Sequence, residues 1–164
     1  MFLVNSRLDI CFEVNTLSQH MVEPLHINWI GVKNLLRYLR GTITYGLRYT
    51  AGNVRLFGYI NVDWAGNVED HKSTSRYCFY LGSASISWMS RKQKLVALST
   101  VEVEYSAARM ASCEVVWLRK LFNELFGFTL DTTVILCNNQ RWDSIIEESR
   151  IHRLLQQIDI IWIW

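Results

Sequence analysis

The sequence predicts an α/β fold in which helices flank a mixed sheet of four strands, with a helical extension in front. Residues 56–89 contain three strand patterns separated by short turns, which is typical of an antiparallel meander. Residues 99–126 then carry apolar side chains at helical spacing, and residues 132–138 contain a short buried strand pattern. Strands and helices in this order indicate a layered α/β domain.

Length and composition indicate a globular intracellular protein. The 164 residues suffice for one domain with an extension, and 50% hydrophobic with 20% charged residues argue against a disordered chain. A net charge of +2 is too small to indicate nucleic-acid binding by itself. The four widely spaced cysteines predict reduced thiols, and no apolar run reaches the ~18 residues of a membrane span. We therefore expect a cytoplasmic or nuclear protein that is neither secreted nor bound to a membrane.

The N-terminal third predicts two helices and a strand. Residues 9–20 and 28–39 carry apolar side chains at helical spacing, with Pro24 between them and Gly41 at the end of the second. Residues 45–50 predict a strand that leads through a tight turn into the next one.

The strand predicted at residues 56–63 is apolar on both faces, which indicates a central position in the sheet. At its end, Asn61 and Asp63 point to the same side. Such a polar pair at the end of a central strand is typical of a metal or catalytic site. On this stretch alone, a turn that ends the strand is the simpler interpretation.

The meander continues through strands predicted at residues 76–81 and 84–89. The basic connection Arg91–Lys94 is, by itself, typical of a solvated loop. Near the C-terminus we expect a helix at residues 140–149, followed by an apolar segment at 151–164 that is helical or extended.

Two helices are expected between the third and fourth strands. Ser99 and Glu102 have the spacing of a capping box, in which the hydroxyl and the carboxylate satisfy backbone amides at the helix start. The helix that they begin runs to about Met110, and a second helix covers residues 114–126.

Several motifs follow one another along the chain. They are Gly58-Tyr-Ile-Asn-Val-Asp-Trp-Ala-Gly66, Lys72-Ser-Thr-Ser75, Lys92-Gln93, Val96-Ala-Leu-Ser-Thr-Val-Glu-Val-Glu-Tyr105 and Cys137-Asn-Asn-Gln140. Together they resemble the RNase H domain of copia-type LTR-retrotransposon polyproteins. Upstream, Arg7-Leu-Asp-Ile10 and Leu36-Arg-Tyr-Leu-Arg-Gly-Thr42 resemble the end of the same family's reverse transcriptase.

The resemblance implies a ribonuclease H-like mixed sheet, in which a parallel fourth strand joins the antiparallel meander. It divides the chain into residues 1–54, a helical remnant that resembles the end of reverse transcriptase, and residues 55–164, an RNase H-like domain. In the family, a final acid follows a fifth strand, and Asp159 would be only a weak substitute for it. Because the chain ends at Trp164, we expect a truncated domain that lacks its last strand and helix.

The family's activity is cleavage of the RNA strand of an RNA–DNA hybrid by two Mg²⁺ ions held by carboxylates. Carried over to this sequence, the first-strand Asp is Asn61, the helix Glu is retained as Glu102, and the fourth-strand Asp is Asn138. Asp63 is a possible but weak substitute ligand. An amide oxygen brings no charge to offset a divalent ion, so we expect no bound Mg²⁺ and a catalytically inactive copy.

Three alternatives remain open. The chain could be an active part of a longer Pol polyprotein, or an open reading frame without function. It could also be a nucleic-acid-binding module without catalysis, in which cations hold phosphates and Trp64 or Trp88 stacks on a base. The cations of that module would be Lys72, Arg76, Arg91, Lys92 and Lys94.

Overall fold

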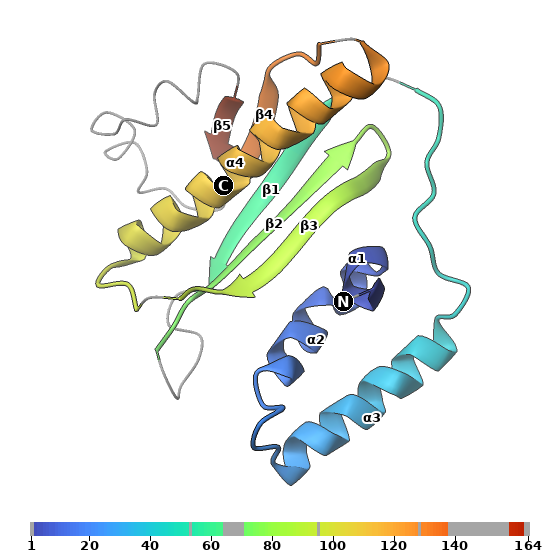
Figure 1. The fold of residues 1–164 in the computed structure, drawn as a ribbon, viewed down its shortest axis with the longest axis vertical. Coiled ribbons are helices and arrows are strands. Elements are labelled where there is room, and N and C mark those ends of the chain that lie inside the picture. Colours follow the sequence, from blue (N-terminus) through green and yellow to red (C-terminus); the bar gives the residue numbers. More distant parts are fainter. Residues whose placement is uncertain are drawn as a thin grey trace. The chain divides into compact units, whose positions relative to one another are not determined.

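The computed structural model describes residues 2–52, 54–63, 71–94, 96–127, 129–137 and 158–162. The chain forms two compact units, Met1–Arg48 and Tyr49–Trp164 (Figure 1). This division falls slightly before the boundary that the sequence predicts between residues 54 and 55. Trp64, Asn138 and the helix predicted at residues 140–149 lie outside the described residues.

The N-terminal unit is helical, as its sequence predicts. Ile10 and Cys11 are buried within it, whereas none of the described residues of its longest helix is buried. The elements are α1 (Phe2–Ser6), the 3-10 helix η1 (Leu8–Ile10), α2 (Cys11–Ser18) and α3 (His26–Gly41).

The strand predicted at residues 45–50 is wrong, because this segment has no regular structure. Its last residues make isolated hydrogen bonds instead of a strand ladder. The Tyr49 hydroxyl donates to the Ser85 carbonyl (2.9 Å), and the Thr50 amide donates to the Ser83 hydroxyl (3.0 Å). An alternating pattern is therefore not enough to form a strand when no sheet edge pairs with the backbone.

The second unit contains a five-stranded mixed sheet in the order β3-β2-β1-β4-β5 (Figure 1). β2 pairs antiparallel with both β1 and β3, while β1 with β4 and β4 with β5 are parallel pairs. β1 is central, as its two apolar faces predict. This is a ribonuclease H-like α/β sheet. The strands are β1 (Leu56–Asp63), β2 (Thr74–Leu81), β3 (Ala84–Lys92), β4 (Thr133–Cys137) and β5 (Ile158–Trp162).

The fifth strand corrects the expectation that the domain lacks it. Residues 158–162 pair in parallel with β4, with Asp159 opposite Val134. A short apolar run rich in isoleucine suits a buried parallel strand as well as a helix, and hydrophobic periodicity cannot tell the two apart at this length. The family's order of motifs did not place a strand so near to Trp164.

A single helix, α4 (Thr100–Phe126), replaces the two that the sequence predicts. Residues 111–113 contain no glycine or proline to break it, and Ala111 and Ser112 are buried. The basic connection is also shorter than expected, because Arg91 and Lys92 complete β3.

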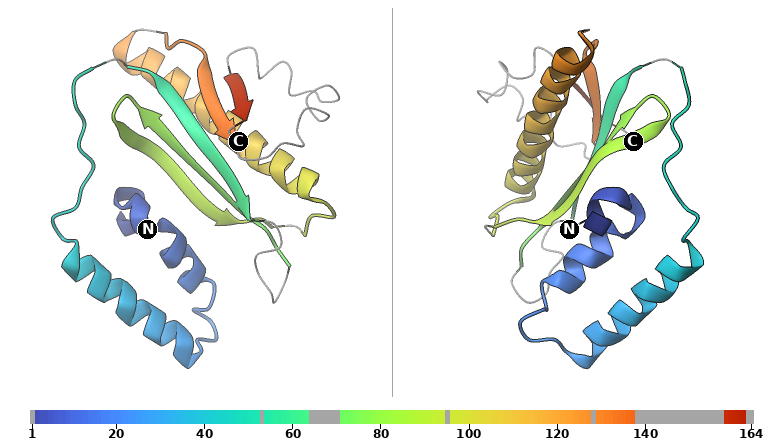
Figure 2. Two further views of the ribbon diagram at one scale, coloured as in Figure 1. Left: turned by 180° about the vertical axis from the view of Figure 1, so that it is seen from behind. Right: turned by 45° about the vertical axis from the view of Figure 1, so that its right-hand side comes forward.

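The core of this unit lies between α4 and one face of the sheet (Figure 2). Small side chains on α4 let the helix approach the strands closely. β1 and β2 contribute Leu56, Ile60 and Phe79 to the cluster, β4 contributes Ile135 and Cys137, and α4 contributes Ala107, Ala108, Ala111, Val115 and Leu118. This packing fixes which side chains of α4 and β1 are turned away from the core.

Candidate functional site

Asn61 and Asp63 end β1 on the side turned away from the core. Along this strand Leu56 and Ile60 are buried, whereas Tyr59, Asn61 and Asp63 are exposed. An Asp63 carboxylate oxygen lies 3.6 Å from a guanidinium nitrogen of Arg76 on the neighbouring strand. Part of the Asp63 charge is therefore offset by Arg76, which weakens it as a substitute metal ligand.

Glu102 completes the predicted capping box at the start of α4, which is confirmed. The Glu102 amide donates to the Ser99 hydroxyl (3.2 Å), and the Leu98 amide donates to the Glu102 carboxylate (2.9 Å). The side chain is exposed. Its carboxylate thus stabilises the first turn of the helix, and the described residues show it making no hydrogen bond or ion pair with the sheet.

Glu104 is a carboxylate that the sequence reasoning missed. It is only 7% exposed and lies on the buried face of α4 together with Val103, Ala107 and Ala108. Carboxylates are rarely this buried without a structural or chemical reason. The signal was available in the sequence, since Glu104 falls on the same helical stripe as the apolar residues that follow it.

The candidate Mg²⁺ ligands carried over from the family that the structure describes are Asn61, Asp63 and Glu102. Asn61 offers a neutral amide, Asp63 faces Arg76, and Glu102 caps a helix. In the part of the chain that the structure describes, no three His, Cys, Asp or Glu side chains are grouped closely enough to hold a metal ion. Mg²⁺ needs several anionic oxygens to offset its charge, and of these three residues only Asp63 and Glu102 carry a carboxylate.

Three of the predicted phosphate-binding cations do come together. Arg91, Lys92 and Lys94 line a pocket of about 500 Å³ between the end of β3 and the first turns of α4, and Arg109 of α4 joins them. Arg109 was not among the predicted residues. The remaining lining residues are Gln93, Ala97, Glu102, Tyr105, Ser106 and Met110. Lys72, Arg76 and Trp88 do not line this pocket.

Gln93 fixes the geometry of this pocket, which we call the basic pocket. Its side-chain amide donates to the Ser75 hydroxyl (2.8 Å) and to the Val103 carbonyl (3.1 Å). Its backbone amide donates to the Ser73 carbonyl (2.8 Å). One residue therefore ties the end of β3 to β2 and to the start of α4.

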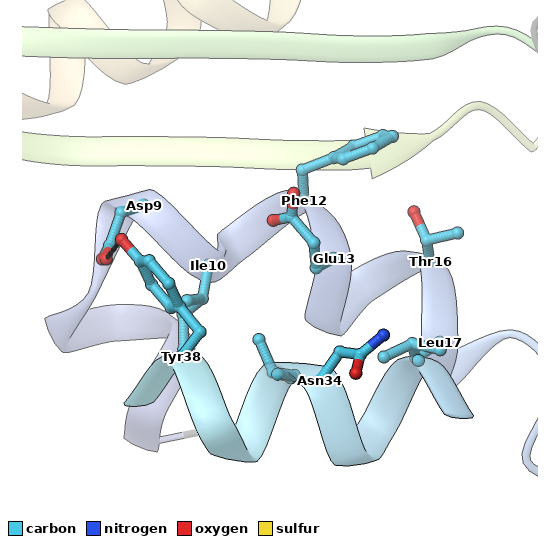
Figure 3. Close-up of a pocket in the computed structure, with 10 residues that line it drawn as sticks. Asp9, Ile10, Phe12, Glu13, Thr16, Leu17, Asn34 and Tyr38 are labelled. Carbon is cyan, nitrogen blue, oxygen red and sulfur yellow. Dashed lines mark hydrogen bonds between the residues drawn. The ribbon is translucent and has the colours of Figure 1, made fainter. Parts of the chain in front are cut away.

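A second cavity of about 590 Å³ lies between α2 and α3 in the N-terminal unit (Figure 3). Asp9 and Tyr38 border it, and the Tyr38 hydroxyl donates to the Asp9 carboxylate (2.8 Å). Two hydrogen bonds from Arg7 to the same carboxylate (2.6 and 2.8 Å) hold its pKa at about 2. The other labelled side chains around it are a mixture of apolar and polar residues.

Comparison with known proteins gives several relatives, although no protein-family model matches the chain. It is 47% identical over 117 residues to the secreted RxLR effector protein 161 of Plasmopara viticola, a match covering 71% of this chain and 82% of that protein. It is 36% identical over 162 residues to the retrovirus-related Pol polyprotein from transposon TNT 1-94 of Nicotiana tabacum, covering 99% of this chain. It is 40% identical over 139 residues to the corresponding polyprotein from transposon RE2 of Arabidopsis thaliana, covering 84% of this chain.

The matches differ in how much of each relative they include. The chain spans only 12% of the tobacco polyprotein and 10% of the Arabidopsis one. Within the described residues, no helix is long and apolar enough to cross a membrane.

Proposed function

The chain belongs to the copia-type retrotransposon Pol polyproteins, and from this we propose that its second unit is an RNase H-like domain that binds nucleic acid without cleaving it. Its partner would be the RNA–DNA hybrid on which the family acts. The ribonuclease H-like order of the sheet and the cations of the basic pocket support the binding part of the proposal.

One observation supports the proposed loss of cleavage. At the positions where the family has Mg²⁺-binding acids, this chain has either an amide or a carboxylate that already interacts with another group of the protein. Asn61 is neutral, Asp63 is paired with Arg76, and Glu102 accepts the Leu98 amide. At an effective dielectric near 20, each lost contact between a divalent ion and a carboxylate forfeits several kcal/mol of attraction before desolvation is included. Losing several such contacts moves Mg²⁺ binding outside the physiological concentration range.

The experiment is a cleavage assay on the purified chain, with a hybrid labelled on its RNA strand and with Mg²⁺ or Mn²⁺ in excess. We expect no metal-dependent cleavage. Glu102→Gln and Glu104→Gln variants prepared in the same way control for contaminating nuclease. Cleavage by the wild-type chain that disappears in either variant would overturn the proposal.

A second candidate, residual nuclease activity within a longer Pol polyprotein, is favoured by the buried carboxylate of Glu104. Under this alternative, the double substitution Asn61→Asp/Asn138→Asp would raise Mn²⁺ affinity by about tenfold or more, which calorimetry would detect. Adding Glu104→Gln to that double variant would then remove the gain, whereas adding Glu102→Gln would leave it. No gain in affinity in the double variant would eliminate this candidate.

We further propose an intracellular location, cytoplasmic or nuclear, because a domain that binds an RNA–DNA hybrid must meet both nucleic acids. The relative from Plasmopara viticola, whose name describes a secreted effector, argues the other way. A tagged chain expressed in eukaryotic cells distinguishes the two: recovery in the nuclear or cytoplasmic fraction supports the proposal, and recovery in the medium contradicts it.

A further inference from the structure

We propose that the basic pocket between β3 and α4 is the nucleic-acid site of this domain, that it grips consecutive phosphates of one strand, and that Arg109 is one of its principal contacts. This inference rests on the proposed function and adds to it the place of binding and the chemical group bound. Lys72 and Arg76 are not part of the proposed site, because neither of them lines the pocket.

The first observation that supports this site is its excess of positively charged side chains. Arg91, Lys92, Lys94 and Arg109 line the pocket, against the single carboxylate of Glu102. Within the described part of the chain, the side chains of Arg91, Lys94 and Arg109 make no hydrogen bond or ion pair. Cations that are not neutralised by the protein can be neutralised by an anionic ligand, and guanidinium groups suit phosphate oxygens because they can donate two parallel hydrogen bonds.

The shape of the pocket favours binding of a nucleic-acid strand over binding of a single phosphate ion. Glu102, Tyr105, Ser106, Arg109 and Met110 recur every three or four residues, so they form one stripe along α4. From Glu102 to Arg109 this stripe is about 10 Å long at 1.5 Å per residue. Successive phosphates of one strand of a duplex rise by roughly 3.4 Å along the axis and also turn around it, so a stripe of this length can contact more than one of them.

The lining also contains groups that suit a sugar or a base. Tyr105 and Met110 are half-buried and lie on the same stripe of α4 as Arg109. An aromatic ring beside a run of cations is typical of surfaces that follow a nucleic-acid strand, because the ring contacts the bases or sugars while the cations hold the backbone. An acidic peptide would use the cations but would gain little from these two side chains.

The N-terminus of α4 adds to the positive field. The Ser99 hydroxyl and the Glu102 carboxylate already accept the Glu102 and Leu98 amides, so the helix end acts through its dipole. Glu102 opposes phosphate binding by its charge. A glutamine at this position keeps an acceptor for the cap and removes the charge, because capping boxes accept either residue.

The test measures binding of the full chain to a fluorescently labelled RNA–DNA hybrid by anisotropy across a range of salt concentrations. At about 50 mM salt, we expect Arg109→Gln and Lys94→Gln each to weaken binding about tenfold and to reduce the slope of log K against log salt by about 0.9. Glu102→Gln should bind several-fold more tightly than the wild type. Lys120→Gln, a matched change at an exposed position of α4 outside the pocket, should bind like the wild type.

The outcomes separate this inference from the proposed function. If the wild type binds the hybrid and both Arg109→Gln and Lys94→Gln bind equally well, the site is elsewhere and only this inference fails. If the hybrid is cleaved, only the proposed loss of activity fails. If the wild type binds no nucleic acid, both fail. Displacement of the hybrid by millimolar inorganic phosphate or by poly-glutamate at constant ionic strength, with the same dependence on Arg109, would also overturn the assignment to a strand.

Discussion

Glu102 and Glu104 are two residues apart on α4 and face opposite surroundings: Glu102 is exposed and caps the helix, while Glu104 is buried on the side that packs on the sheet. A helix turns by about 100° per residue, so positions two apart point in nearly opposite directions. The acid that the family resemblance selects from the sequence is therefore the one occupied with backbone amides. Any chemistry that needs a carboxylate against the sheet depends on Glu104.

The capping role of Glu102 leads to the first prediction. Ser99→Ala should lower the free energy of unfolding by about 1 kcal/mol, because a helix N-terminus loses its side-chain acceptor. Glu102→Ala should cost less. The double variant should cost less than the sum, since the two side chains form one reciprocal unit. Urea denaturation measures all three, and Glu102→Gln is the control that keeps an acceptor. Strict additivity would contradict a capping box.

The second prediction concerns the close approach of Gly58 to Phe79. A Cβ atom built on Gly58 would overlap ring atoms of Phe79, and that ring is completely buried. Gly58→Ala should therefore destabilise the second unit by about 1–3 kcal/mol through overpacking. The measurement is the midpoint of chemical denaturation, monitored by circular dichroism.

Two further variants test this explanation. Gly52→Ala should leave stability nearly unchanged, because a Cβ there meets no atom within 4 Å. Combining Gly58→Ala with Phe79→Leu should cost less than the two single changes added together, since the smaller side chain makes room for the methyl group. Full additivity in the double variant would show that the clash is not the cause.

The fold could be predicted largely from local patterns. β1, β2 and β3 appear in the sequence as strand-like runs, the last two joined by a short turn, and the capping box places the start of α4. The strand predicted at residues 45–50 was wrong because a strand also needs a neighbouring strand to pair with, and the residue pattern does not show whether one is present. The break predicted near Met110 was wrong because residues 111–113 contain no glycine or proline to end a helix there. β5 was missed because an apolar run of five residues has no distinctive period.

The candidate site was harder to predict than the fold. Arg91, Lys92 and Lys94 are adjacent in the sequence, so their clustering was visible, but by itself it resembled an ordinary solvated loop. Arg109 is distant in the chain and joins them only because α4 passes the end of β3. The partner of Asp63 was equally hidden, because the pairing of β1 with β2 brings Arg76 beside it.

The third prediction concerns a polar cluster between α4 and the sheet. The Ser87 hydroxyl donates to the Glu114 carboxylate (2.6 Å). Burial, and then the charge and hydrogen bonding of Glu114, raise the pKa of Tyr77 above its ordinary range, while Arg91 opposes the rise. Glu114→Gln removes the charge, so the pKa of Tyr77 should fall but stay raised by burial. A spectrophotometric titration of tyrosinate, with Tyr77→Phe to identify its share, measures this.

The same cluster has a consequence for alkaline stability. The pKa of Tyr77 is higher in the folded state than in the unfolded state. Its contribution to the free energy of unfolding is therefore complete below the ordinary tyrosine pKa of about 10, and it declines as the pH rises above that value. Glu114→Gln should reduce this decline. Identical titration and stability curves for wild type and Glu114→Gln would show that Glu114 has no influence on Tyr77.

The fourth prediction concerns the acid sensitivity of the N-terminal unit. Hydrogen bonds from Arg7 lower the pKa of Asp9 to about 2, and the Tyr38 hydroxyl adds to this effect. A carboxylate whose folded-state pKa is depressed stabilises the fold above its unfolded pKa of about 3.9 and ceases to do so as the pH falls towards 2. The group is partly exposed, so we expect a loss of about 1 kcal/mol rather than the full value of the shift. The amide NMR signals of residues 7–42, followed from neutral pH to about pH 2, should show the unit loosening in this window. Asp9→Asn should be loosened already at neutral pH and show little further change, whereas equal acid sensitivity in that variant would assign the transition to another group.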